Sequence, residues 1–244
     1  MDDFEEYENN EKTEEINFKD IQNTASITAD NGKYVIHCLV IAGQIEGHYL
    51  LPPHNKTTKY EHILPQLAAV EQDEKIDGLL VILNTVGGDV EAGLAIAEMI
   101  SGMSKPTVSL AIGGVHSIGA PIACSSKCSF IAKSASMTLH PIRVNGLALG
   151  APQMMSYFDK IQDRIINFVA ERSKIRAERY KELMTNSGEL VGDIGSDLDG
   201  ERAVREGLID KVGGISDALD CLYKMIDEKR SQKADEESDG RNQG

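Results

Sequence analysis

The sequence predicts an α/β fold, a parallel sheet covered by helices, from the alternation of apolar runs with helical patterns. Three runs, at 34–41, 78–84 and 107–112, are continuous and rich in Val, Ile and Leu, which is typical of strands buried on both faces. Patterns of helical period at 63–70 and 90–103 follow the first two runs. Strands and helices that alternate with short connections favour parallel pairing.

The other elements are expected from turn signals and apolar spacing. Ser117 opens a helix that runs through Ala123, after the bend at Gly113-Gly114. We also expect short strands at 129–132, 136–139 and 208–212, a loop at 146–150, a long helix at 152–185, a Gly/Asp-rich connection at 186–200, and helices at 201–206 and 215–229. Because about 30 residues is long for a helix of a globular domain, part of the long helix is expected to leave the body and pack on something else.

Charge and length predict one domain at 21–229 between two tails. The net charge is −14, and residues 1–16 hold eight Asp/Glu and one Lys, which is half of it. We therefore expect a disordered acidic tail at 1–20 and a disordered polar tail at 230–244. The rest of the chain has no basic stripe, which argues against nucleic-acid binding.

Hydropathy predicts a cytoplasmic protein without membrane insertion. No apolar run approaches the length of a membrane-spanning helix. The N-terminus is acidic and lacks the basic-then-apolar start of a secretory signal.

The four cysteines are expected to be reduced thiols in such a compartment. Cys124 and Cys128 could form half a zinc site, but no second Cys/His pair at ligand spacing follows them. The favoured interpretation is two small residues that pack near a core strand. We expect no metal and no cofactor.

Small residues crowd the ends of the apolar runs and suggest acyl-transfer chemistry. Ser117 lies at a strand-to-helix bend, where a serine is exposed and near free backbone N–H groups. His140, at the end of a short strand, is a suitable base for it. The Gly87-Gly88 turn and the amide of Ile118 can supply donors to a tetrahedral intermediate.

Each of these residues also has an ordinary interpretation. Ser117 could be a simple helix N-cap, and His140 a strand-end residue satisfied by the backbone. The glycine pair could be a turn or a phosphate cradle. His116 is a rival base, although neighbours on a bend rarely face each other. The nucleophile-elbow pattern requires glycine where Val115 stands.

Five segments, in order and at compatible spacing, resemble the ClpP family, the proteolytic subunits of ATP-dependent Clp proteases. Segment 87–96 (GGDVEAGLAI) is similar to that family's Gly-Gly-x-Val-x-Ala-Gly-x-x-Ile motif. The others are 105–106 (KP), 116–120 (HSIGA), 137–141 (MTLHP) and 203–210 (AVREGLID), so the resemblance spans about 35–225.

The resemblance implies a crotonase-like superhelix of ββα units, with 152–185 as a protruding handle helix through which two rings of subunits meet. It implies a self-compartmentalised serine endopeptidase of peptides or unfolded polypeptides. Ser117 would be the nucleophile and His140 the general base. Gly88 and Ile118 would form the oxyanion hole.

The family's catalytic aspartate has no direct counterpart. Counting back without gaps from the closing motif leads to Gly195. Asp193 and Asp197 flank it and Asp199 lies beyond, and we predict Asp193 as the third catalytic residue. The segment 194–214 also resembles signal peptide peptidases, which use a Ser–Lys dyad. That resemblance would bring in Lys160 or Lys174 as the base.

Partners follow from the resemblance as well. The acidic residues 1–16 stand where the family has an apolar axial segment beside the ATPase ring, which argues against a Clp ATPase partner. A similar family member is associated with secretion of precursor proteins, which implies a role in clearing precursors. Two other functions remain open: a non-catalytic ring scaffold or adaptor, and an acyl-CoA enzyme on the same fold.

Overall fold

The computed structural model describes residues 25–143, 151–190 and 193–241, without the side chains of 151–153 and 237–241. The expected acidic tail 1–20 and the loop 146–150 lie outside the described residues. The elements are β1 (Ser26–Asp30), β2 (Val35–Glu46), β3 (Thr57–Lys59), α2 (Tyr60–Gln72), β4 (Gly78–Gly88), α3 (Val90–Ser101), β5 (Thr107–Val115), α4 (Gly119–Ala123), β6 (Cys128–Ile131), β7 (Ser136–Leu139), α5 (Ala151–Arg172), α6 (Ala177–Met184), β8 (Ser196–Asp199), α7 (Gly200–Arg205), β9 (Lys211–Val212) and α8 (Ile215–Arg241).

The expected α/β fold with a parallel sheet is confirmed. Its strands lie in the order β1-β2-β4-β5-β6-β9, and all of these neighbours pair parallel except β1 with β2. In the register, Ile45 faces Gly88 and Thr85 faces Val115. The carboxyl ends of β2, β4 and β5 therefore meet at one edge of the sheet, where ligands of parallel sheets usually bind.

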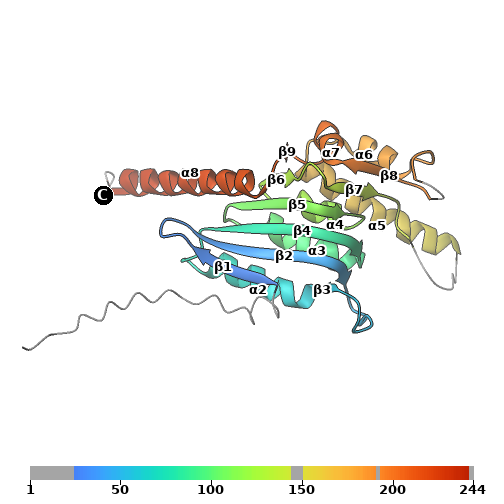
Figure 1. The fold of residues 1–244 in the computed structure, drawn as a ribbon, viewed down its shortest axis with the longest axis horizontal. Coiled ribbons are helices and arrows are strands. Elements are labelled where there is room, and N and C mark those ends of the chain that lie inside the picture. Colours follow the sequence, from blue (N-terminus) through green and yellow to red (C-terminus); the bar gives the residue numbers. More distant parts are fainter. Residues whose placement is uncertain (1–24, 144–150, 191–192, 242–244) are drawn as a thin grey trace, which may run out of the picture.

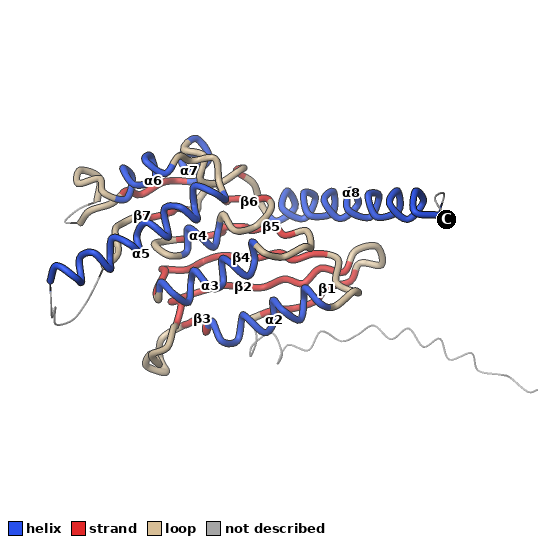
Figure 2. The backbone as a smooth tube through the Cα atoms, turned by 180° about the vertical axis from the view of Figure 1, so that it is seen from behind, coloured by secondary structure: helices blue, strands red, loops and turns tan. Residues whose placement is uncertain are grey.

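Helices cover both faces of the sheet and bury its central strands. On one face, α2, α3, α4 and α5 lie side by side over the strands (Figure 2), and their apolar side chains form the larger core. On the other face, Ala218, Leu222 and Ile226 of α8 pack in a second cluster with Leu80 and Phe130. Two-sided burial explains why these strands are continuous apolar runs.

The prediction of one long helix at 152–185 is wrong, because two shorter helices, α5 and α6, occupy this segment. The backbone N–H of Lys174 donates to the carbonyl of Gly207 at 2.8 Å instead of continuing the helix. The hydroxyl of Ser173 donates to the carbonyl of Val169 at 2.6 Å, which satisfies one of the last free carbonyl groups. Arg176 is the N-cap of α6.

The prediction of a disordered polar tail from residue 230 is also wrong for residues 230–241, which are helical. Helix α8 continues through it and extends away from the sheet (Figure 1). Residues 228–236 are exposed and include Ala, Glu, Lys and Gln, which are strong helix formers. Propensity without an apolar face is enough to extend a helix that is anchored elsewhere.

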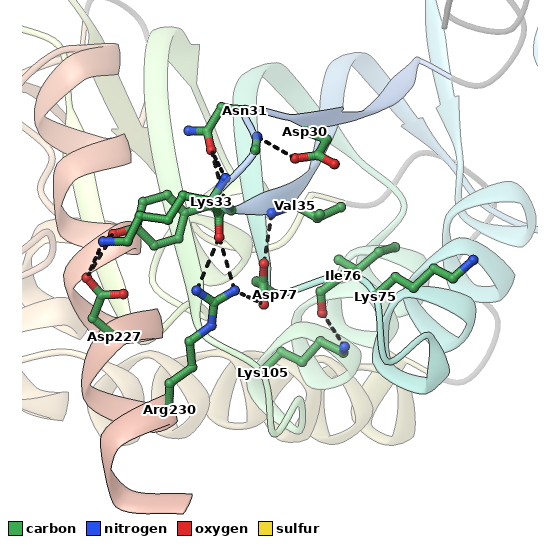
Figure 3. A network of polar contacts seen from close by, with 12 residues as sticks. Asp30, Asn31, Lys33, Val35, Lys75, Ile76, Asp77, Lys105, Asp227 and Arg230 are labelled. Carbon is green, nitrogen blue, oxygen red and sulfur yellow. Dashed lines mark hydrogen bonds and ion pairs between the residues drawn. The ribbon is translucent and has the colours of Figure 1, made fainter. Parts of the chain in front are cut away.

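A polar network anchors α8 to the first strands (Figure 3). The Arg230 guanidinium donates to Asp77 at 2.7 Å and to the carbonyl of Lys33 at 3.1 Å. The second oxygen of Asp77 accepts the backbone N–H of Val35 at 2.8 Å. The rings of Tyr34 and Tyr223 stack with centroids 4.2 Å apart. These contacts join the start of β2 to the middle of α8.

None of the described helices combines the length and the apolar character that crossing a bilayer requires.

Replacement of Leu222 by alanine should lower the free energy of unfolding by about 2–5 kcal/mol. The Leu222 side chain of α8 is fully buried against the sheet, and its removal leaves a cavity. Urea denaturation followed by circular dichroism measures the loss. Lys224→Ala, two residues along on the exposed side of the same helix, is the control and should change stability by less than about 0.5 kcal/mol. Equal losses in both variants would contradict the packing of α8 on the sheet.

Candidate active site

Ser117 lies on the bend between β5 and α4 at the carboxyl edge of the sheet. Its φ is +56°, a left-handed conformation that non-glycine residues seldom adopt. Its backbone N–H donates to the carbonyl of Thr138 at 2.8 Å, and its carbonyl accepts the N–H of Ala120 at 3.0 Å. The residue is half-buried and lines a cavity. Backbone strain held in place by such bonds is typical of functional sites.

His140 directly follows β7 and lines the same cavity as Ser117, a space of about 120 Å³. Its Nδ1 lies 2.7 Å from the carbonyl oxygen of Pro141. Because a carbonyl oxygen only accepts, Nδ1 carries the proton in this contact. The neutral ring then has its lone pair on Nε2, which is the form that can take a proton from a serine.

Gly88 and Ile118 line this cavity too. Gly88 has a φ of +152°, and a Cβ there would lie 2.2 Å from the carbonyl oxygen of Ile45, so no other residue fits. Ile118 is the N-cap of α4, and within the described part of the chain its N–H donates to no carbonyl. Four of the five predicted site residues are therefore brought together around one cavity.

Asp193 is not brought to His140. It forms an ion pair with Arg143, and both side chains are exposed. Asp197 accepts a hydrogen bond from the hydroxyl of Thr138 at 3.0 Å, and Asp199 caps α7. In the described ranges no carboxylate makes a hydrogen bond to His140.

Gly195 occupies the position beside the histidine. Strand β8 pairs antiparallel with β7, and Ser196 faces Leu139, so the next residues in register are Gly195 and His140. A Cβ on Gly195 would lie 3.0 Å from Cβ of His140 and 2.2 Å from the carbonyl oxygen of Leu139. With a φ of +142°, the position admits only glycine. The residue to which the motif count leads therefore lies beside His140, and it carries no side chain.

Strand β8 was not expected, since the segment 186–200 was predicted as a connection. Its only signal is the alternation of buried Ser196 and Leu198 with exposed Asp197 and Asp199. Four residues are too short for such a period to be recognised in the sequence alone.

None of the three rival bases is among the residues described around the cavity. Nδ1 of His116 accepts the backbone N–H of Thr138 at 3.1 Å. Lys174 forms an ion pair with Asp210 at 2.8 Å. Lys160 is exposed on α5 and, like Lys174, is not among the residues described around the cavity.

The rest of the cavity wall is mostly apolar. It consists of Val90, Leu139, Pro141, Ile142, Ile165, Tyr180 and Met184, with Arg143 as the one charged side chain among the described lining residues. A space of about 120 Å³ accepts one apolar side chain, and it is much smaller than the roughly 300–1,000 Å³ of pockets that bind small molecules. The site thus combines a serine, a histidine, the residues Gly88 and Ile118, and one small apolar subsite.

The two neighbouring cysteines lie in the protein interior. Cys124 donates to the carbonyl of Ala120 at 3.2 Å, and burial raises the pKa of its thiol to about 12. Cys128 is buried on β6 in the cluster under α8. Among the residues that the structure describes, no three His, Cys, Asp or Glu side chains are grouped so that they could hold a metal ion.

Comparisons with known proteins support the fold and identify related proteins. The model of the Clp protease family matches residues 38–216. The chain is 58% identical over 195 residues to the translocation-enhancing protein TepA of Halalkalibacterium halodurans, which covers 80% of this chain and 76% of that protein. A ClpP1 mutant from Listeria monocytogenes has a similar structure, with a TM-score of 0.59 and 20% identity over 75% of this chain and 94% of that one. At that identity the structural likeness shows the fold alone.

Replacement of Gly195 by alanine should lower the free energy of unfolding by more than about 2 kcal/mol, because the new methyl group collides with the carbonyl of Leu139 in a left-handed conformation. Gly188→Ala in the same loop is the matched control, since its nearest neighbour would lie at an ordinary 3.7 Å. Urea denaturation of both variants measures the difference. A neutral Gly195→Ala would mean that this loop does not pack against His140.

Proposed function

The chain belongs to the Clp protease family, and on this premise we propose that it is a serine peptidase with Ser117 as nucleophile and His140 as general base. The observation that carries the proposal is the one cavity that Ser117 and His140 line together with Gly88 and Ile118. A serine next to a histidine with a free Nε2 is the minimum for nucleophilic catalysis of acyl transfer.

In the first half-reaction, the Ser117 hydroxyl attacks the peptide carbonyl carbon while Nε2 of His140 takes the hydroxyl proton. The carbonyl oxygen becomes negative and points toward the N–H groups of Gly88 and Ile118. The C–N bond then breaks, and the amine leaves with the proton that His140 returns. Water repeats these steps on the acyl-enzyme and releases the acid.

The orienting group of His140 in this proposal is the carbonyl of Pro141 in place of a carboxylate. The carbonyl selects the correct tautomer, because it accepts the proton of Nδ1. It stabilises the imidazolium that forms during catalysis less than a carboxylate would, because it carries no net charge. In a serine protease triad, replacing the carboxylate by an amide costs about 10⁴-fold, which is ascribed to the wrong tautomer. With the tautomer kept by Pro141, the loss expected here is smaller and comes from the missing negative charge. We therefore expect slow turnover.

The substrate class follows from the apolar subsite and the family. We propose that a medium-sized apolar side chain next to the scissile bond enters the cavity, from a peptide or an unfolded precursor. TepA is named for enhancing translocation, and the 58% identity supports a role in protein translocation here. The small volume argues against the acyl-CoA alternative. Homo-oligomeric rings, cytoplasmic location and independence of a Clp ATPase stay part of the proposal.

A fluorophosphonate probe should label the intact protein once per chain, as measured by mass. Ser117→Ala should abolish labelling because the nucleophile is gone, and His140→Ala should slow it at least about 100-fold because no base remains. Asp193→Asn should keep most of the rate, because Asp193 is paired with Arg143. Loss of labelling in Asp193→Asn would show that the carboxylate reaches His140 in the working protein.

A non-catalytic scaffold is the second candidate, favoured by the glycine at position 195 beside His140. It predicts that the parent protein forms rings but reacts with the probe no faster than Ser117→Ala does. Labelling that depends on His140 rules it out.

Peptides with Leu or Met before the scissile bond should be cleaved at least about tenfold faster, in kcat/KM, than peptides with Asp or Lys there. A charged group would lose its hydration on entering the apolar cavity. Quenched peptides that differ only at this residue provide the measurement. Equal rates would mean that the cavity is not the subsite for that side chain.

A further inference from the structure

We propose that His116 is a positioning residue: its ring accepts the N–H of Thr138 and thereby holds β7, and with it His140, in register with Ser117. The inference rests on the proposed function, because it concerns the geometry of the Ser117–His140 pair. It assigns a side-chain role to the residue that precedes the nucleophile.

Both backbone groups of Thr138 are held by consecutive residues of the serine bend. Its N–H donates to Nδ1 of His116 at 3.1 Å, and its carbonyl accepts the N–H of Ser117 at 2.8 Å. His140 is two residues further along the chain, directly after β7. The two bonds together therefore fix the position of His140 along the direction of β7 relative to Ser117.

The backbone ladder alone does not provide this link. Strand β7 pairs with β5 only at Gly114 and Ser136. Beyond that single pair, the backbone contact is the bond from Ser117 to Thr138. The imidazole of His116 accepts the N–H of Thr138, which a backbone carbonyl would accept in a regular ladder.

The ring itself is closely held. The backbone N–H of His116 donates to the carbonyl of Thr85 at 3.0 Å, and its carbonyl accepts the N–H of Gly119 at 2.9 Å. A Cβ on Gly114 would lie 2.2 Å from Nε2 of His116. The ring thus lies directly against the glycine backbone of β5, and only one ring nitrogen faces β7.

The contact requires a neutral imidazole, since a protonated Nδ1 donates and cannot accept. Burial lowers the pKa of His116 below its usual value, which keeps the ring neutral near neutral pH. The charged or titratable groups that act on it are Asp197 of β8, which raises the pKa, and His140 after β7, which lowers it. As pH falls through the lowered pKa, the bond and its contribution to stability are lost.

The variants that test the inference are His116→Leu, which removes the acceptor at similar bulk, and His116→Asn, whose Oδ1 lies near the place of Nδ1. Labelling of Ser117 by the fluorophosphonate should slow on the order of 100-fold in His116→Leu. It should stay within about threefold of the parent in His116→Asn, which keeps the acceptor. The labelling rate of His116→Asn should also fall less steeply with acid, because one protonation is removed.

His37→Leu is the matched control. His37 on β2 is also a half-buried histidine whose Nδ1 bonds a neighbouring strand, here the hydroxyl of Thr28 at 2.9 Å. His37 faces β1 and is not among the residues described around the cavity. Its replacement should leave the labelling rate of Ser117 unchanged.

Hydrogen–deuterium exchange of peptides covering residues 137–140 gives a readout that does not depend on catalysis. Protection should be lost in His116→Leu and kept in His116→Asn and His37→Leu. Unchanged protection in His116→Leu, or an equal loss of labelling in the Asn and Leu variants, overturns the inference. If the parent protein is never labelled, the proposed function fails, and the exchange result alone decides whether His116 positions β7.

Discussion

The hydrogen bond from the N–H of Ser117 to the carbonyl of Thr138 is the contact on which the site depends. It joins the end of the parallel sheet to the short antiparallel pair of β7 and β8. Together with the pair Gly114–Ser136 and the bond from Thr138 to His116, it holds the strained serine and the histidine in one unit. The parallel sheet ends β4 and β5 at the same edge, so that Gly88, Ser117 and Ile118 line one cavity.

Much of the scaffold and the serine–histidine pair could be predicted from the sequence, because buried parallel strands are long apolar runs and because glycine pairs mark sharp bends. The carboxylate could not, since Asp193 and Gly195 are two residues apart and only the register of β8 decides which one faces His140. The break between α5 and α6 depends on a bond from Lys174 to the distant Gly207, which no local pattern contains. The extent of α8 was missed because its last turns lack an apolar face.

Hydrogen bonds from uncharged groups, more than ion pairs, hold the residues of the site in place. A carbonyl holds His140, and a second histidine acts as an acceptor for the backbone. Asp193 is paired with Arg143, and Asp197 accepts a hydrogen bond from Thr138. Preorganised dipoles of this kind cost no reorganisation during a reaction, but they do not neutralise a positive charge.

Helix α8 blocks other proteins from binding the apolar sheet residues that it covers. The family model ends at residue 216, so almost all of α8 is an addition to the matched region. It covers Leu80, Leu110 and Phe130 with Leu222 and Ile226. A protein that sought those sheet residues would first have to displace a tethered helix, which is always present at high effective concentration. That face is therefore occupied in cis, and recognition of this chain by others is directed to its remaining surfaces.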